Sequence, residues 1–497
     1  MRTRCGIREA RDSELDSAVM SIATYRETRL RSSCGRMVEA HPGQSGVFAL
    51  QEGLDAFAAR VLLAGAAEHT LDVQYYIWHH DMSGTLLLEA LHRAADRGVR
   101  VRLLLDDNNT AGLDPWIAAL DAHPNIEVRL FNPFKHRRWR LLDYVVHFAR
   151  ANRRMHNKSF TADGQATIIG GRNVGDEYFG AGQDISFVDL DVIAVGPVVE
   201  EVSRDFERYW TSGSAISAAV VVAPAAESAI ADIGAAAHRV EHDPLGVKYI
   251  HAVARAPFVR DLLEGNLRLE WATVHMVSDD PAKGLARATD ATLLWNRLKA
   301  IIDSPKRELE LVSPYFVPGA EGVKELTQLA RAGVNITVLT NALEATDVPA
   351  VHAGYAKRRK PLLAAGIKLY ELKRLASGRS PRGSGGGLMG SSSSSLHAKT
   401  FAVDRTRLFV GSFNFDPRSA RLNTEMGFVI ESAALANVVA NACIQRVPEM
   451  SYRVSLKESG SLEWTDGNQH FDCEPGTSLG RRLLVRFLAL LPIEWLL

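Results

Sequence analysis

Two segments of the chain repeat the pattern His-x-Lys-x4-Asp, which combines side chains suited to nucleophilic and acid–base chemistry. The first reads MHNKSFTADGQATIIGGRN and the second LHAKTFAVDRTRLFVGSFN, with the two histidines 241 residues apart. The residues are His156, Lys158 and Asp163 in the first copy, and His397, Lys399 and Asp404 in the second. A single His beside a Lys is usually a solvated strand edge, whereas two equivalent copies indicate a site.

The spacing explains what such a site can do. On a strand, residues i and i+2 share a face, so each His and Lys projects into one pocket. A neutral imidazole can attack phosphorus, an imidazolium can protonate the leaving oxygen, and two lysines can neutralise the non-bridging oxygens. Each motif is followed by small residues, TIIGG or LFVGS, that let the backbone and an Asn side chain approach a phosphate.

The motifs lie at the same place in an internal repeat. In each copy a strand pattern is followed by a helical pattern that ends at a glycine, Gly98 or Gly333, and then by two more strand patterns. The predicted strands are 71–77, 99–105 and 126–131 in the first copy, and 308–316, 334–340 and 367–372 in the second. Alternating strands and helices predict an α/β fold: two tandem domains related by a pseudo-twofold, each a mixed, mainly parallel sheet flanked by helices.

The expected organisation has five parts. An N-terminal segment (1–45) is a candidate for disorder, the first domain covers 46–215, and a linker covers 216–240. The second domain covers 241–450, and the C-terminal segment (451–497) is a candidate for a membrane interface. The tract GRSPRGSGGGLMGSSSSS, just before His397, is predicted to be a surface loop, either a plain insertion or a mobile lid.

Composition weighs against several classes of protein. Lys and Arg number 58, as do Asp and Glu, so no bulk positive field is available to recruit nucleic acid. Cys5, Cys34, Cys443 and Cys473 lack metal-ligand spacing, and we expect no disulfide framework, metal or cofactor. No stretch approaches the ~20 apolar residues of a membrane-spanning helix.

The paired motifs resemble those of the phospholipase D superfamily, over roughly residues 45–450. Several stretches are similar to its bacterial cardiolipin synthase branch: LDVQYYIWHHDMSG, AADRGVRVRLLLDD, SPYFVPG, LHAKTFAVD and GSFNFDPRSARLNTEMG. The resemblance implies a metal-independent, two-step reaction through a phosphohistidine. It implies that His156 is the nucleophile and His397 the general acid and then base, although exchanging these roles leaves every spacing unchanged.

The resemblance also implies supporting residues. A carboxylate about thirty residues after each His is expected to orient that imidazole, which points to Asp189, 33 residues after His156, and Glu425, 28 residues after His397. Asp191 is the alternative to Asp189, and a purely structural pairing of either acid is equally open. The remaining expectations are that the Asp residues of both motifs brace the chain and that three residues contact the phosphate: Asn173, Asn414 and Ser412.

Two segments are candidates for contact with a membrane. FNPFKHRRWRLLDYVVHFARANRR, just before His156, interleaves basic and aromatic residues and forms either an interfacial segment or a buried helix with a solvated charged face. RRLLVRFLALLPIEWLL, at the C-terminus, forms either an interfacial helix or a segment packed on the core.

The favoured hypothesis is cardiolipin synthesis, in which a phosphatidyl group passes from a donor phospholipid to phosphatidylglycerol. The donor is phosphatidylglycerol or phosphatidylethanolamine, and we expect a monomer that is peripheral on the cytoplasmic side of a bacterial cell membrane. The alternatives are hydrolysis to phosphatidic acid, a nuclease of the same superfamily, and a lipid-binding protein without activity.

Overall fold

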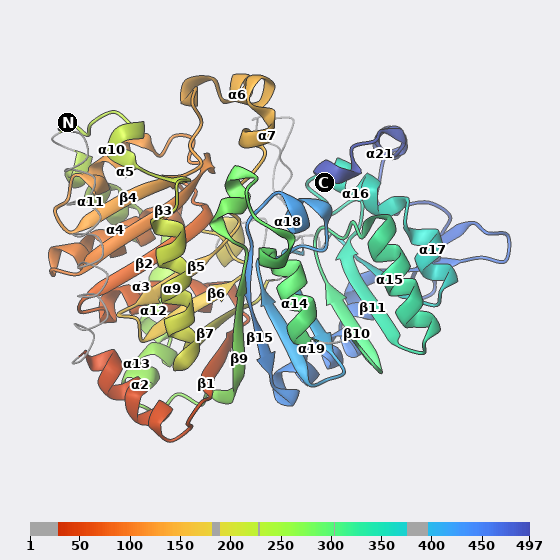
Figure 1. Ribbon diagram of the computed structural model, residues 1–497, viewed down its shortest axis with the longest axis horizontal. Coiled ribbons are helices and arrows are strands. Elements are labelled where there is room, and N and C mark those ends of the chain that lie inside the picture. Colours follow the sequence, from red (N-terminus) through yellow and green to blue (C-terminus); the bar gives the residue numbers. More distant parts are fainter. Residues whose placement is uncertain (1–27, 181–188, 227–228, 303, 375–395) are drawn as a thin grey trace.

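A computed structural model describes residues 28–180, 189–226, 229–302, 304–374 and 396–497. The Gly/Ser tract before His397 and the first 27 residues of the segment expected to be disordered lie outside these ranges. Two mixed sheets stand side by side and meet at the centre of the molecule, where β1, β9 and β15 are neighbours (Figure 1).

The first sheet has the strand order β8–β4–β3–β2–β5–β6–β7–β1–β9. Its strands are β1 (Ser45–Leu50), β2 (Thr70–Ile77), β3 (Arg100–Asn109), β4 (Ile126–Phe131), β5 (Ser159–Ala162), β6 (Ala166–Gly170), β7 (Asp191–Val195), β8 (Ala215–Ser217) and β9 (Glu270–Ser278).

The second sheet continues from β9 in the order β9–β15–β14–β13–β10–β11–β12–β16–β17–β18. Its further strands are β10 (Glu308–Val312), β11 (Asn335–Asn341), β12 (Lys368–Leu372), β13 (Thr400–Val403), β14 (Arg407–Gly411), β15 (Met426–Glu431), β16 (Ser451–Leu456), β17 (Leu462–Asp466) and β18 (Gln469–Phe471).

The repeated α/β architecture is confirmed, but the expectation of mainly parallel sheets is wrong. Among the described strands, only β2–β3–β4 and β10–β11–β12 pair in parallel, and the other ladders are antiparallel. The reason is that each parallel trio is extended by a hairpin, β5–β6 or β13–β14, that carries one motif. A two-residue turn joins antiparallel strands, whereas only crossover helices join parallel ones.

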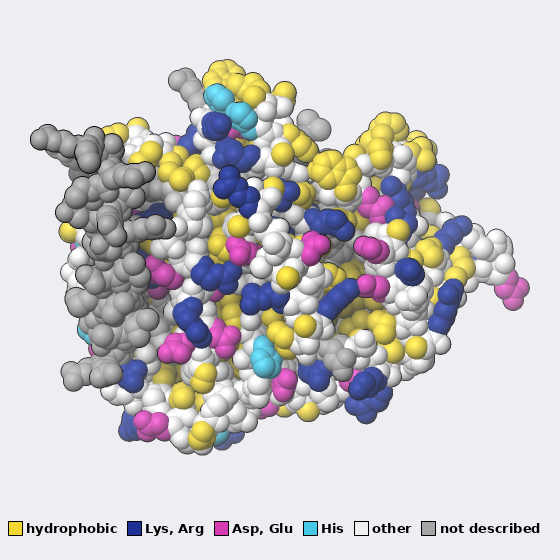
Figure 2. Space-filling model, in the orientation of Figure 1, with side chains coloured by type: hydrophobic (Ala, Val, Ile, Leu, Met, Phe, Trp, Pro, Cys, Tyr) yellow, Lys and Arg dark blue, Asp and Glu magenta, His cyan; other side chains and the backbone are white. Residues whose placement is uncertain are grey.

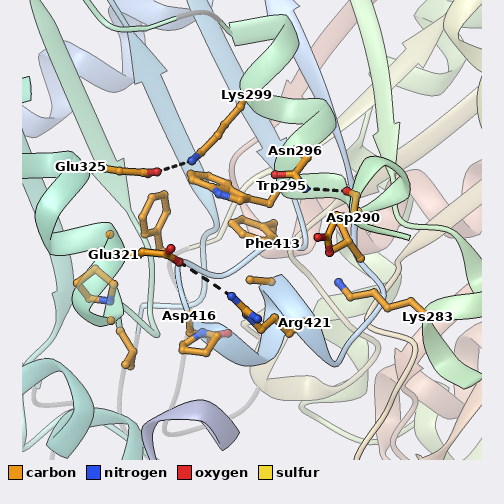
Figure 3. Close-up of a pocket in the computed structure, with 18 of the residues that line it drawn as sticks. Lys283, Asp290, Trp295, Asn296, Lys299, Glu321, Glu325, Phe413, Asp416 and Arg421 are labelled. Carbon is orange, nitrogen blue, oxygen red and sulfur yellow. Dashed lines mark hydrogen bonds and ion pairs between the residues drawn. The ribbon is translucent and has the colours of Figure 1, made fainter. Parts of the chain in front are cut away.

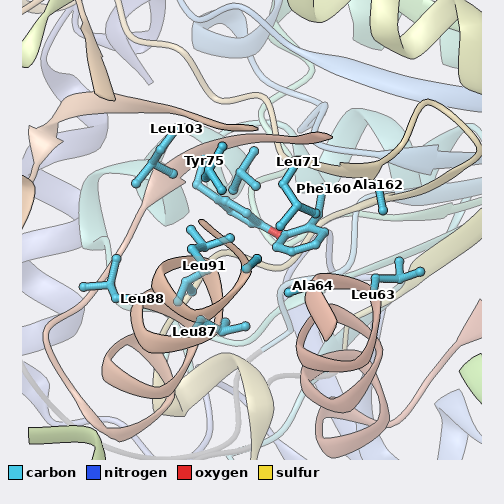
Figure 4. Close-up of a cluster of buried hydrophobic side chains, with 14 of the residues drawn as sticks. Leu63, Ala64, Leu71, Tyr75, Leu87, Leu88, Leu91, Leu103, Phe160 and Ala162 are labelled. Atoms are coloured by element: carbon cyan, nitrogen blue, oxygen red, sulfur yellow. The ribbon is translucent and has the colours of Figure 1, made fainter. Parts of the chain in front are cut away.

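Helices cover the outer faces of the first sheet. They are α2 (Arg29–Glu39), α3 (Gly53–Ala66), α4 (Met82–Asp96), α5 (Asp114–Asp121), α6 (Arg140–Val146), α7 (Phe148–Ala151), α8 (Asp176–Phe179), α9 (Pro197–Trp210), α10 (Ala218–Val221), α11 (Ala229–Glu241), α12 (Gly246–Arg255) and α13 (Phe258–Leu263). The apolar sides of α3 and α4 pack on β2, β3 and β5 through Leu63, Leu87, Leu91 and Tyr75 (Figure 4). The segment expected to be a linker takes part in this packing, because Ile233 and Ala237 of α11 are buried in the same core.

The second sheet carries α14 (Leu294–Ile302), α15 (Gly319–Arg331), α16 (Pro349–Ala356), α17 (Arg359–Ala364), α18 (Pro417–Arg421), α19 (Ala433–Gln445), α20 (Val447–Met450) and α21 (Leu479–Leu490). Short 3₁₀ turns are η2 (Arg137–Trp139), η3 (Pro281–Leu285), η4 (Asp290–Thr292) and η5 (Glu494–Leu496). A third core, built from α9, α19 and the central strands, joins the halves. No helix in the described ranges has the length and apolarity to cross a bilayer.

Candidate active site

The aspartates of both motifs hold the hairpins in place. Asp163 Oδ1 accepts hydrogen bonds from the backbone N–H groups of His69 (2.8 Å) and Thr70 (2.9 Å), at the start of β2. Asp404 Oδ1 accepts equivalent bonds from Arg307 (2.7 Å) and Glu308 (3.0 Å), at the start of β10. Each therefore ties the turn of its hairpin to the neighbouring strand, as the sequence predicts, and leaves the chemistry to His and Lys.

The two histidines are oriented by carboxylates from the opposite halves of the chain. His156 Nδ1 lies 2.8 Å from Glu425 Oε2, and His397 Nδ1 lies 2.6 Å from Asp189 Oδ2. The sequence identified both acids, but the expectation that each serves the His of its own half is wrong. The reason is that the Glu425 segment is bonded to the first motif: His156 N donates to Thr424 O at 2.8 Å. Each imidazole thus keeps Nδ1 on its acid, and Lys399 Nζ lies 3.1 Å from Nε2 of His397.

Asp191 is excluded as the partner of either histidine. Its carboxylate forms a fully buried ion pair with Arg60 (2.8 Å) and lies 3.6 Å from Arg172. This arrangement is structural, because both arginines are held under the first sheet by buried contacts. The open choice between Asp189 and Asp191 is therefore decided for Asp189.

The residues that follow each hairpin shape the space for the two acids. A Cβ at Gly171 would lie 2.2 Å from Asp189 Oδ1, so only glycine lets this short acid reach across. Ser412 stands at the equivalent place in the second half, and its hydroxyl donates to Glu425 Oε2 at 2.5 Å. Here the hydroxyl proton of Ser412 is directed at the acid, and the expectation that Ser412 contacts the phosphate stays a prediction. A serine hydroxyl has one proton to donate.

Both lysines lie under the histidines with their ammonium groups buried. Lys158 Nζ and Lys399 Nζ each donate to the carbonyl oxygen of the histidine two residues before it. Burial lowers the pKa of Lys399 to about 8 and also lowers the pKa of Lys158 well below its usual value. Two neighbouring buried lysines favour the binding of an anion, because the negative charge of a phosphodiester compensates the positive charge of their ammonium groups.

The same charges control the histidines. Burial, together with repulsion from the lysines, lowers the pKa of His397 to about 3 and the pKa of His156 well below its usual range. Burial alone would raise the pKa of Asp189, but His397 and Lys399 lower it, so Asp189 is ionised. Burial raises the pKa of Glu425 to about 7. These shifts favour two neutral imidazoles and distinguish the two acids.

The asparagines after the motifs lie in the same buried layer. Asn173 Oδ1 accepts from Ile77 N at 3.2 Å, and Asn414 is 5% exposed, with an Oδ1 that has no hydrogen-bond partner among the described residues. An unpaired buried amide oxygen is costly unless a ligand or water meets it. The expectation that Asn173 and Asn414 contact the phosphate stays a prediction.

Known proteins resemble this arrangement. The family model described as "Cardiolipin synthase, PLD-like domain" matches residues 62–210 and 298–445, which contain one motif each. Cardiolipin synthase C of Escherichia coli is 50% identical over 94% of this chain and 100% of its own length.

The chain belongs to the cardiolipin synthase family of phospholipase D-like proteins.

More distant proteins are also similar to this chain. A cardiolipin synthase of Geobacillus kaustophilus is 26% identical over 76% of this chain and 61% of its own. The phosphatidylserine synthase of Haemophilus influenzae shares the fold, with a TM-score of 0.58 and 13% identity over 95% of this chain and 100% of its own. The predicted branch of the superfamily is confirmed.

Sequence reasoning missed the aromatic residues that pack on the two imidazoles of this family site. The Tyr76 ring lies 4.9 Å from the His156 ring, and the Tyr178 ring lies 5.0 Å from the His397 ring, both edge-on. Tyr76 ends the first predicted strand, and that position was the available signal, because side chains at the carboxyl ends of parallel strands face the site. These rings limit how each imidazole can rotate.

Two groups of metal-ligand side chains occur in the described ranges, and neither includes a motif residue. They are His92, Asp96 and His123, and His136, Asp143 and His147. His123 Nδ1 accepts from Asn125 N (3.1 Å), which places its proton on the nitrogen that faces Asp96. Asp143 already accepts from the N–H of Lys135 and of His136. Both groups are thus explained by hydrogen bonding.

A hollow of about 890 Å³ is lined by Phe413 and Asp416, which follow the second motif, but by none of the His and Lys residues of the two motifs (Figure 3). Trp295 and Phe413 stack in it at 5.7 Å, and Lys299 and Glu325 pair across its rim at 2.6 Å. Ser412 and Phe413 are neighbours on the chain, but one faces Glu425 and the other faces this hollow. The hollow therefore belongs to the helix packing of the second half.

Proposed function

We propose that the protein synthesises cardiolipin by transferring a phosphatidyl group from a donor phospholipid to phosphatidylglycerol. The observation that carries this proposal is the pair of imidazoles, each held by an acid from the other half, with two buried lysines between them. Membership of the cardiolipin synthase family supports the lipid substrate class.

The first step forms a covalent intermediate. Glu425 holds Nδ1–H of His156, so the lone pair on Nε2 attacks the donor phosphorus and forms a P–N bond. The P–O bond to the head-group alcohol breaks, and the His397 imidazolium gives its Nε2 proton to the departing oxygen. Glycerol leaves if the donor is phosphatidylglycerol, and ethanolamine leaves if it is phosphatidylethanolamine.

The second step reverses these roles. A hydroxyl of the acceptor phosphatidylglycerol loses its proton to His397 Nε2 and attacks the phosphorus of the phosphatidyl–His156 intermediate. The P–N bond breaks, its electron pair returns to His156, and cardiolipin forms. The two lysines balance the charge on the non-bridging oxygens throughout.

The unequal acids support His397 as the proton carrier. Asp189 is ionised beside His397, and an ionised acid stabilises an imidazolium. Burial and then repulsion from the lysines lower the pKa of His397, and the negative charge of a bound phosphodiester offsets that repulsion. Glu425, whose pKa is raised to about 7, leaves His156 closer to a neutral nucleophile.

The remaining expectations belong to the same proposal. The donor is phosphatidylglycerol or phosphatidylethanolamine, the enzyme acts as a monomer, and it works at the cytoplasmic face of the membrane. The paired imidazoles would equally support hydrolysis if water replaced the acceptor, so the acceptor decides between transferase and hydrolase.

A product assay tests the proposal. Membranes containing labelled phosphatidylglycerol, with and without phosphatidylethanolamine, are incubated with enzyme and chelator, and the lipids are identified by mass spectrometry. Cardiolipin with released glycerol or ethanolamine supports the transfer and names the donor. Phosphatidic acid without cardiolipin would make the protein a hydrolase, and His156→Ala and His397→Ala serve as inactive controls.

A further inference from the structure

Exposed apolar side chains are concentrated on two small parts of the molecule. Of the nineteen large hydrophobic residues that are exposed in the described ranges, twelve belong to these parts. We name them the α6 tip (residues 137–148) and the α21 tip (residues 479–496). Their members are Trp139, Leu141, Leu142, Val145, Val146 and Phe148 in the α6 tip, and Leu479, Leu483, Leu484, Phe487, Leu490 and Trp495 in the α21 tip.

The α6 tip is folded with its polar side inward. Asp143 is fully buried and binds the backbone N–H of Lys135 and the ring of His136 (2.7 Å). Leu141 and Val145, in contrast, are 83% and 80% exposed. A surface helix of a soluble monomer exposes its polar side chains and buries its apolar ones, so the exposed apolar side chains of α6 indicate contact with an apolar environment. The alternative that this segment forms a buried helix is thereby contradicted.

The α21 tip is attached by one narrow side. Val485 is buried in a small cluster with Ala353 of α16 and with Leu343, which precedes α16. Leu490, in contrast, is 84% exposed. Arg486 is exposed on the same helix and has no ion pair among the residues that the structure describes. An apolar face with a cation at its border is suited to lipid acyl chains next to anionic head groups.

The two tips project from the same edge of the molecule (Figure 1), and yellow apolar caps mark both in the space-filling view (Figure 2). They come from different halves of the chain but meet at their bases, where the rings of Phe148 and Trp495 lie 6.4 Å apart. Two separate elements with one shared orientation can enter one flat surface together.

This edge also carries the catalytic histidines. Tyr144 of α6 donates to Asn108 Oδ1 at 2.7 Å, Asn108 reaches the hydroxyl of Tyr76, and the Tyr76 ring packs on His156. On the other side, Arg418 N donates to the carbonyl oxygen of Leu497 at 2.7 Å, next to the α21 tip. The tips are therefore tied by direct contacts to the segments around the site.

We propose that the α6 and α21 tips form one docking surface for a bilayer that contains anionic phospholipids. Insertion of both tips places the carboxyl ends of the parallel strands, and with them His156 and His397, against one leaflet. This docking proposal relies on the proposed function only to explain why the protein binds a membrane, because binding to lipid requires no catalysis.

Vesicle flotation tests the surface. Leu141→Glu with Val145→Glu alters one tip, and Phe487→Glu with Leu490→Glu alters the other. The control is Val438→Glu with Ile444→Glu, two exposed apolar positions on α19, away from both tips. On vesicles of phosphatidylglycerol and phosphatidylethanolamine we expect each tip variant to lose at least about tenfold in bound fraction and the control to bind like wild type. Circular dichroism and thermal melts confirm folding.

A second measurement follows the surface directly. Trp139 and Trp495 lie in different tips, so their emission should shift to shorter wavelength with anionic vesicles, and Trp139→Phe with Trp495→Phe should remove most of that shift. Equal binding by tip variants and wild type, equal loss in the α19 control, or equal binding to pure phosphatidylcholine would overturn the proposal. A protein that floats with vesicles but makes no cardiolipin would retain this surface and refute the proposed function instead.

Discussion

The two halves carry the same motif on equivalent hairpins, yet the two sheets differ in whether a buried acid beside the motif has an ion-pair partner. In the first half, Asp72 of β2 pairs with Arg102 of the neighbouring β3 at 2.8 Å, and Arg102 also reaches Glu207. The equivalent residue of β10 is Glu310, which lies opposite Thr337 of β11. Glu310 has no ion pair among the described residues, and burial raises its pKa to about 7. The motif residues therefore occupy equivalent positions in the two halves, but only the buried acid of the first half is neutralised by an arginine.

A second difference concerns the space between helices. In the first half, Tyr249 of α12 packs on Phe57 of α3 at 4.5 Å, and α11 and α12 cover the groove between α3 and α4. The corresponding α14 and α15 leave an apolar hollow of about 510 Å³ next to the one of Figure 3. The two halves are therefore alike where the fold positions His and Lys, and they differ in how the helices pack on each sheet.

The largest effect is expected from removing either histidine. His156→Ala and His397→Ala should each lower cardiolipin formation by at least ~10³-fold, because one loses the nucleophile and the other the proton carrier. Product analysis with labelled phosphatidylglycerol measures the loss. Substantial activity in either variant would mean that the two halves do not share one site.

The acids should differ in the size and pH dependence of their effects. Asp189→Asn removes an ionised partner and should lower kcat by ~10²-fold or more, whereas Glu425→Gln should cost about tenfold near pH 7. Glu425 has a pKa of about 7, so its carboxylate is lost as the pH falls through 7.

Wild-type activity should accordingly decline below pH 7, and Glu425→Gln should lack that decline. The pH profile of kcat is the measurement, and it separates a positioning role from a merely structural one. If Asp189→Asn and Glu425→Gln had identical profiles, the inferred inequality of the two acids would be wrong.

A loss of stability should follow from a change to the buried ion pair of the first half. Arg102→Met leaves Asp72 buried without a cation and should destabilise the protein by ~3–5 kcal/mol in urea unfolding. The double variant Asp72→Leu with Arg102→Met removes both charges and should recover part of that loss. A double variant less stable than the single one would contradict this account.

The smallest effect, with the opposite sign, is expected in the second half. A buried acid with a raised pKa stabilises the fold below its unfolded pKa, near 4.5, and that stability is lost as the pH rises through about 7. Glu310→Gln should therefore raise Tm at pH 8 by about 2–4 °C and leave it unchanged near pH 4.5. Calorimetry at both values checks the prediction, with Glu308→Gln, on the same strand, as the control.

The sequence predicted the residues of the site better than their pairing. Both motifs, Asp189 and Glu425 followed from spacing and resemblance, and the structure brings all of them to one edge. The crossing of the acids could not be predicted, because distance along the chain says nothing about which half a loop reaches. The contact of Ser412 with Glu425 could not be predicted for a similar reason, because it depends on the loop that brings this acid beside the serine hydroxyl.

The pairing of the strands could likewise be predicted only in part from the sequence. The βαβ pattern identified the parallel trio in each half, but the antiparallel ladders outnumber the parallel ones among the described strands. Positive φ at Asp163 (51°) and Asp404 (52°) fits the turn of each hairpin. Tyr76 and Tyr178 were missed because contact with a ring depends on tertiary packing.

The crossed acids have a consequence for incomplete chains. A fragment that ends between the halves, whether from interrupted translation or from proteolysis, carries one histidine without the acid that orients it. It would also lack the second lysine, so it could neither hold a phosphodiester nor activate a nucleophile. Assembly of a complete site therefore requires both halves of the chain, because each half supplies the acid that orients the histidine of the other.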